Sequence, residues 1–133
     1  MVIIFPCKQI DRKRTMNCAR GMHGKIRDRF DLTLECIRLW YLGQDNPLYV
    51  VIERYKSFFE LFVDFKGYVE FFLLQDLIDE KTQRIKFWLP YEDFHHQIVV
   101  PRDKDEYQLY MESVLSFVKL RNQRIDKWQE SSV

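Results

Sequence analysis

The stretch that decides the fold reads KIRDRFDLTLECIRLWY, residues 25–41. Apolar residues recur in it at the three- and four-residue spacing of an amphipathic helix, so we predict a helix over residues 25–42 that ends at Gly43. At about 100° per residue its charged side chains gather on one arc, which we interpret as the solvent face. This arc comprises Arg27, Asp28, Asp31, Glu35 and Arg38.

Arg29 is the exception, because it falls inside the wide apolar face of this helix. Arg121 interrupts the apolar stripe of the C-terminal helix in the same way, and Gln75 and Asp76 interrupt an apolar run. Because a buried ion without a partner is unstable, we expect Arg29 and Arg121 to share a partner at Gln75 and Asp76. This internal polar network either fixes how the helices meet the sheet or grips a phosphate or carboxylate, and both readings stay open.

Two further segments have helical patterns. In the first, Asn46 is a candidate capping residue, and apolar side chains recur at helical spacing until Gly67, where we expect the helix to end. The second begins at Asp103, where Glu106 three positions later completes a capping-box pattern, and its apolar stripe extends to Trp128. The chain therefore has three main predicted helices.

The remaining segments are predicted to be extended or irregular. A short apolar run ending in proline predicts a strand over residues 2–6, and a second short strand is expected near residues 15–19. Residues 68–79 and 84–90 predict a hairpin joined by a four-residue loop. In residues 68–79, however, apolar side chains occur at both odd and even positions, so the pattern alone does not separate a strand from a helix. Residues 91–102 are expected to be an irregular connection.

These elements predict an α+β fold, with three main helices packed against a small antiparallel sheet formed by the N-terminal strand and the 68–90 hairpin. The chain has 133 residues, of which 47% are hydrophobic, so we expect one domain over residues 1–133. No stretch approaches the roughly 18 uncharged apolar residues of a membrane span, and the first residues are too few for a signal peptide. The three cysteines have no disulfide-type spacing, so we expect free thiols and a cytoplasmic protein.

The charge of the chain is unevenly distributed. Residues 1–29 carry eight Lys and Arg against two Asp, a net +6, so in a chain of net charge +1 the remaining residues carry −5. A basic leading segment on an acidic body can bind an anionic partner such as a nucleic acid, or the two parts can neutralise each other in the fold. The candidate contact residues are Arg12, Lys13, Arg14, Arg20, His23 and Lys25.

Residues 17–25, NCARGMHGK, are a more local candidate for anion binding. Gly21 and Gly24 free the backbone just before a predicted helix N-terminus, where N–H groups favour anions. Arg20 and Lys25 would add positive charge, and His23 could transfer a proton near neutral pH. The stretch matches no phosphate-loop motif, so plain turn chemistry is the alternative.

No catalytic or metal-binding template fits the sequence. His95 and His96 are adjacent, so a strand would point them to opposite faces, and no HExxH or paired Cys/His spacing occurs. We therefore expect no metal and no cofactor. A zinc site built from Cys7, Cys18 and His23 is the alternative that the composition leaves open.

Four stretches carry a resemblance to a known family: RGMHGKIRDRFDLTLECIRLWYLGQDNPL, FFELFVDFKGYVEFFLLQDLID, FWLPYEDF and RNQRI. Over nearly its whole length the chain resembles uncharacterised, mainly bacterial proteins catalogued as a domain of unknown function. This family offers no activity, cofactor or catalytic residue to transfer, and its typical members carry an additional N-terminal portion that the resemblance implies this chain lacks. The family pattern agrees with the chain at Arg20, Gly21, Asp28, Arg29, Asp31, Glu35, Gln75, Asp76, Arg121 and Asn122.

Two functions are compatible with these observations. The first is a small cytoplasmic binding or interaction protein without evident catalysis, an accessory or inhibitory factor of a bacterium or phage, whose anionic partner is a nucleic acid or a protein. The alternative is an enzyme or ligand-binding domain that recognises a phosphate- or carboxylate-bearing small molecule through Arg20, Arg29 and Arg121. A homodimer formed through exposed aromatic residues such as Trp40 or Trp128 is a third hypothesis, and no membrane contact is expected.

Overall fold

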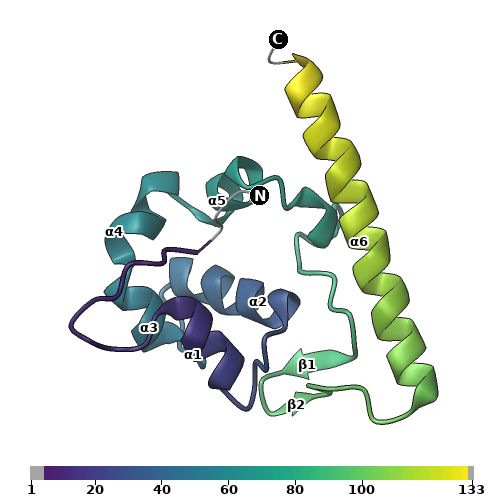
Figure 1. Ribbon diagram of the computed structural model, residues 1–133, viewed down its shortest axis with the longest axis horizontal. Helices are drawn as coiled ribbons and strands as arrows, with labels where there is room; N and C mark the ends of the chain where they lie inside the picture. The colour runs from purple at the N-terminus through teal and green to yellow at the C-terminus, as the bar shows by residue number, and fades with distance from the viewer. Residues whose placement is uncertain (1–4, 132–133) are drawn as a thin grey trace.

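The computed structural model describes residues 5–131, which form an α+β arrangement of six α-helices, two 3-10 helices and a two-stranded antiparallel sheet (Figure 1). The first half of the chain contains α1 (Met16–Met22), α2 (Phe30–Tyr41), α3 (Tyr49–Arg54), α4 (Lys56–Phe59), η1 (Glu60–Phe62) and α5 (Phe65–Phe71). The second half contains η2 (Gln75–Leu77), β1 (Tyr91–Asp93), β2 (His96–Gln97) and α6 (Lys104–Ser131). The predicted α+β class is therefore confirmed.

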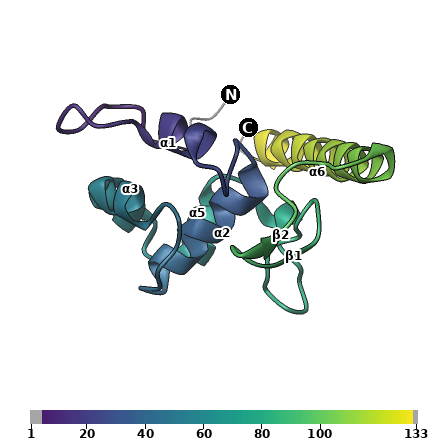
Figure 2. The same cartoon turned by 90° about the horizontal axis from the view of Figure 1, so that it is seen from below.

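Helix α2 lies at the centre of the molecule, with the short helices on one side and α6 on the other (Figures 1 and 2). It begins five residues later than predicted, because Arg27 and Asp28 both have left-handed backbones, with φ of 48° and 64°. Arg29 is thus the residue that precedes the helix, in an extended conformation, and not a member of its apolar face. The predicted C-terminal end is nearly right, since Leu42 is the last capping residue and Gly43 follows with φ of 72°.

The solvent face predicted for this helix is wrong at two of its five residues. Asp31 and Glu35 are buried, with 0% and 1% of their surfaces exposed, whereas Arg27 and Asp28 are exposed and Arg38 is half-buried. The reason is tertiary: the backbone N–H of Trp88 donates to Asp31, so the segment after residue 84 covers this side of α2. A helical wheel cannot show which distant segment covers an arc.

The single helix predicted between Asn46 and Gly67 is instead four short pieces. Asn46 Oδ1 does accept from Leu48 N at 3.0 Å, but the chain then turns through α3, α4 and η1. The break before α5 is at Val63, whose φ of 74° is strained for a β-branched residue, and Asp64 N donates to Phe62 O across it at 2.9 Å. Asp64 then caps α5 through Gly67 N at 2.8 Å, so Gly67 lies inside a helix and does not end one.

The predicted 68–90 hairpin is also wrong, since its first strand is replaced by α5 and η2. One isolated antiparallel bridge between Ile78 and Ile85 remains, and the polar loop between them is held by Asp79, whose Oδ1 accepts from Lys81 N and Thr82 N at 2.9 Å. A run whose apolar residues follow neither a helical nor an alternating period suits a buried helix as well as a strand. The Asp64 cap and the i, i+4 ring contact between Tyr68 and Phe72 favour the helix here.

The predictions for the N-terminal residues, for the connection after residue 90 and for the last helix have different outcomes. The strand over residues 2–6 lies mostly outside the described residues, and Phe5 and Pro6 are not in a strand. Residues 15–19 are not a strand either, because Thr15 caps α1 by accepting from Cys18 N. The connection after residue 90 contains the small β1–β2 hairpin. The start of α6 is confirmed, since Asp103 Oδ1 accepts from Glu106 N at 2.9 Å.

The hydrophobic core forms around α2, whose Leu32, Leu34 and Ile37 are fully buried. Aromatic rings from α4 and α5 pack on one side of it, and Trp88 packs on the other. Helix α6 crosses that second side with its half-buried Tyr110 and Phe117 in contact with Trp88, at ring-centroid distances of 5.8 and 6.1 Å. The core therefore holds α2 rigidly in the position from which its polar residues act.

Replacement of Gly67 by alanine tests the tight turn at Val63. A Cβ atom at position 67 would lie 2.0 Å from the backbone oxygen of Phe62, so the turn must shift, and Gly67→Ala should lower the free energy of unfolding by roughly 1–3 kcal/mol in urea denaturation. Gly24→Ala is the matched control, because a Cβ atom there has no neighbour within 4 Å. Equal stability of the two variants would contradict this geometry.

Candidate functional site

The best-defined polar group in the structure is the buried ion pair of Arg29 and Asp31, with 3% and 0% of their side chains exposed. The guanidinium donates to both carboxylate oxygens, one bond from Nε measuring 3.0 Å and the other running from Nη2 to Oδ2. Asp31 also accepts from Leu32 N at 2.9 Å and from Trp88 N at 2.8 Å. Every hydrogen bond of this carboxylate is therefore directed inside the protein.

The free edge of Arg29 is also used internally. Its Nη1 donates to the backbone oxygen of Ile98 and, at 3.2 Å, to that of Val99. The guanidinium carbon lies 5.8 Å from the ring centre of Tyr110 on α6. Arg29 thus joins α2, the connection after the hairpin and α6, and each of its three guanidinium nitrogens donates within the fold.

Arg20 is the second buried arginine, and it is joined to Arg29 through Thr33. Thr33 Oγ1 accepts from Arg20 Nε at 2.9 Å and donates to the backbone oxygen of Arg29 at 2.8 Å. Arg20 also donates to Asp28 Oδ1 at 2.8 Å and to Asp28 O at 2.7 Å. Burial lowers the pKa of Arg20, and the neighbouring Asp28 carboxylate acts in the opposite direction. Arg20, a predicted contact residue, is therefore part of the internal structure.

The predicted network of Arg29, Gln75, Asp76 and Arg121 is not formed. Arg121 donates to the backbone oxygen of Phe72 at 2.9 Å, and Asp76 pairs instead with Arg124 through two bonds of 2.9 and 3.1 Å. The prediction failed because Arg29 finds a carboxylate two residues away, across the turn that begins α2. The three arginines of the alternative hypothesis, Arg20, Arg29 and Arg121, consequently do not converge on one pocket.

Other predicted contact residues do converge, around a hollow of about 660 Å³ beside the loop that precedes α1. We call it the basic hollow. Its charged and titratable lining residues are Arg12, Lys13, Arg14, His23 and Arg54, and neither Asp nor Glu lines it. Arg54 was not predicted, because no local pattern connects α3 with a loop forty residues earlier in the chain. Its Nη2 donates to the backbone oxygen of Arg14 at 3.2 Å.

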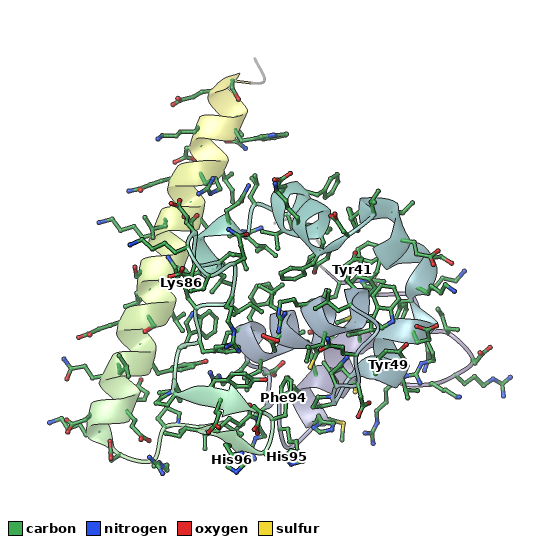
Figure 3. All side chains as sticks on the ribbon, turned by 180° about the vertical axis from the view of Figure 1, so that it is seen from behind. Tyr41, Tyr49, Lys86, Phe94, His95 and His96 are labelled. Carbon is green, nitrogen blue, oxygen red and sulfur yellow. The ribbon has the colours of Figure 1, made fainter. Side chains whose placement is uncertain are left out.

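A second hollow, of about 560 Å³, adjoins the first, because His23 and Pro47 line both. We call it the mixed hollow. Four carboxylates (Glu35, Asp45, Glu92 and Asp93) and three Lys and Arg (Lys25, Arg38 and Arg84) line it. Lys25 Nζ lies 3.3 Å from Nδ1 of His95, and Figure 3 shows His95 with Phe94 and His96 at the end of the hairpin. The predicted contact residues His23 and Lys25 thus meet carboxylates from α2 and the hairpin.

Three pKa shifts describe the mixed hollow and its rim. Burial, followed by the nearby Glu35 and Cys36, raises the pKa of Tyr91. The exposed His96 forms a hydrogen bond with the accepting Asp93 carboxylate, and this bond raises the pKa of His96. The carboxyl pKa of Asp93 is correspondingly lowered.

Metal ligands are not brought together in the part of the chain that the structure describes. Within residues 5–131 no group of three or more His, Cys, Asp and Glu side chains is arranged to hold an ion. Two residues of the alternative zinc site have other partners: Cys18 Sγ contacts Met22 Sδ at 3.7 Å, and His23 Nδ1 accepts from Lys25 N at 3.1 Å. None of the helices among these residues is both long and apolar enough to cross a membrane.

This geometry defines a small α+β protein with two adjoining polar hollows beside a central helix. The chain belongs to a family described as a "Family of unknown function (DUF6994)", whose model matches residues 1–125. Searches of curated proteins and of solved structures gave no match. The family assignment agrees with the resemblance noted in the sequence to a domain of unknown function.

Replacement of Asp31 by asparagine tests the structural role of the buried pair. Asn keeps the shape of the side chain but leaves the Arg29 charge buried without a counter-ion, so Asp31→Asn should lower the free energy of unfolding by about 3–5 kcal/mol. Glu60→Gln, which removes an exposed pair with Lys56, should change it by about 0.5 kcal/mol or less. Urea denaturation of the two variants measures both values, and a stable Asp31→Asn protein would contradict the assignment.

Proposed function

We propose that the protein acts by binding an anionic partner in the basic hollow, and that this partner is the phosphate backbone of a nucleic acid. The observation that carries the proposal is the lining of that hollow, where four Lys and Arg side chains meet without a carboxylate. In a chain of net charge +1, such segregation concentrates positive potential at one place. An accessory or inhibitory role would follow from such binding.

The character of the lining supports a phosphate backbone in preference to the bases. Arg12, Lys13 and Arg14 are exposed and follow one another along a loop, so each can contact a phosphate. No aromatic side chain lines the basic hollow, so it offers no surface on which bases could stack. Arg54 supports the loop from α3, and its Nε is hidden from solvent without a hydrogen-bond partner in the described chain.

The salt dependence of nucleic-acid binding tests this proposal. Arg14→Gln and Arg54→Gln should each weaken binding of a mixed-sequence oligonucleotide and reduce the slope of log affinity against log salt concentration by about one, because each removes one phosphate contact. Fluorescence anisotropy at several salt concentrations measures both quantities. Melting temperatures would show that the variants remain folded.

Lys119→Gln is the matched control for lost charge. Lys119 is exposed on α6, on the opposite side of the molecule from the loop that precedes α1 (Figure 2). Its replacement should leave both affinity and slope close to those of the natural protein. Equal effects of Lys119→Gln and Arg14→Gln, or no binding at low salt, would sink the proposal.

A further inference from the structure

The two adjoining hollows differ in the kind of group that each can accept. The basic hollow has four Lys and Arg and no carboxylate, whereas the mixed hollow has three Lys and Arg and four carboxylates. A phosphate is therefore favoured in the first and disfavoured in the second by simple electrostatics. An uncharged group with hydrogen-bond donors suits the mixed hollow better.

Glu35 supplies the specific evidence for such a donor. It lies on the lining of the mixed hollow with only 1% of its surface exposed. Its Oε1 accepts from both Nε and Nη2 of Arg38, the first at 2.9 Å. Its Oε2 is buried and has no hydrogen-bond partner in the described chain. Because an unsatisfied buried carboxylate oxygen is destabilising, a ligand N–H that reached Oε2 would be strongly favoured.

Aromatic residues stand beside this carboxylate. Tyr91 and Phe94 line the mixed hollow, at 5.4 Å between ring centres. Tyr91 is fixed by a stacked contact with Phe87, at 3.9 Å. Phe94 lies at the turn of the hairpin beside His95 (Figure 3). The two rings meet edge to face, and an exposed aromatic face of this kind can stack on a planar ring.

We infer that the mixed hollow binds a nucleobase that carries an exocyclic amino group, which donates a hydrogen bond to Oε2 of Glu35 while the attached phosphate lies in the basic hollow. This inference rests on the proposed function and adds base recognition to it. The shared residues His23 and Pro47 place the two hollows next to each other, as the two ends of one nucleotide require. Thymine presents a carbonyl oxygen where cytosine presents its amino group, and a carboxylate repels that oxygen.

Oligonucleotides of cytosine and of thymine, each about twelve nucleotides long, test the inference because the two bases differ chiefly in this group. The natural protein should bind oligo-dC roughly tenfold more tightly than oligo-dT in fluorescence anisotropy at pH 7.5. CMP and UMP serve as competitors against labelled oligo-dC. Displacement by CMP and not by UMP would support the inference and identify a free nucleotide as sufficient, whereas equal displacement by the two would overturn it. If neither displaces the labelled strand, a strand is the ligand, and the dC/dT affinity ratio decides the inference.

Glu35→Gln should bring the dC/dT affinity ratio close to one, because the glutamine amide can present N–H donors to the hollow. Asp45→Asn is the matched control, since it removes one negative charge from the rim of the same hollow and should leave the ratio unchanged. Circular dichroism establishes that both variants fold. If Glu35→Gln does not fold, the preference of the natural protein and the NMR shifts of residues 91–95 on addition of CMP or UMP decide the question.

The failures of the two proposals are distinguishable. Equal affinity of the natural protein for oligo-dC and oligo-dT, with binding still weakened in Arg14→Gln, would overturn base recognition and keep backbone binding. A dC preference that survives in a folded Glu35→Gln protein would remove Glu35 from recognition and overturn the inference. No binding of either oligonucleotide at low salt would overturn the proposed function and this inference together.

Discussion

The buried pair of Arg29 and Asp31 connects parts of the chain that are far apart in sequence. Asp31 accepts the N–H of Leu32 in the first turn of α2 and the N–H of Trp88, while Arg29 donates to the carbonyls of residues 98 and 99. Each partner thus fixes one side of the segment that carries the β1–β2 hairpin. Since the hairpin and α2 together form the mixed hollow, the shape of that hollow depends on an ion pair that does not line it.

The sequence predicted the class of fold and the residue that mattered most, but it did not predict its partner. Arg29 stood out because a guanidinium among apolar residues needs a counter-ion. The helical pattern hid the answer, because Asp31 was assigned to a solvent face that the chain after residue 84 covers. Signals carried by a few neighbouring residues, such as the Asp103 cap, were predicted correctly. The 68–79 run failed because its apolar pattern has no single period.

The candidate site was predictable to the same limited extent. The basic character of Arg12, Lys13 and Arg14 is a property of consecutive residues, so composition alone identified them. Arg54 and Glu35 were not identified, because each acquires its role from a segment distant in the chain. When a residue joins a site from a distant helix or strand, the amino acids next to it in the sequence give no sign of that role. Only the packing of the fold distinguishes it from other charged residues on the surface.

Helix α6 has a different relation to the rest of the molecule. No residue between Lys104 and Ser131 is buried, although the helix is the longest element described and covers Trp88 and the Arg29 side chain. A helix held by half-buried side chains can separate from the body at less cost than global unfolding. Such local opening would expose the buried ion pair to water while leaving the aromatic core around α4 and α5 intact. The two sides of α2 would then differ in protection from hydrogen exchange.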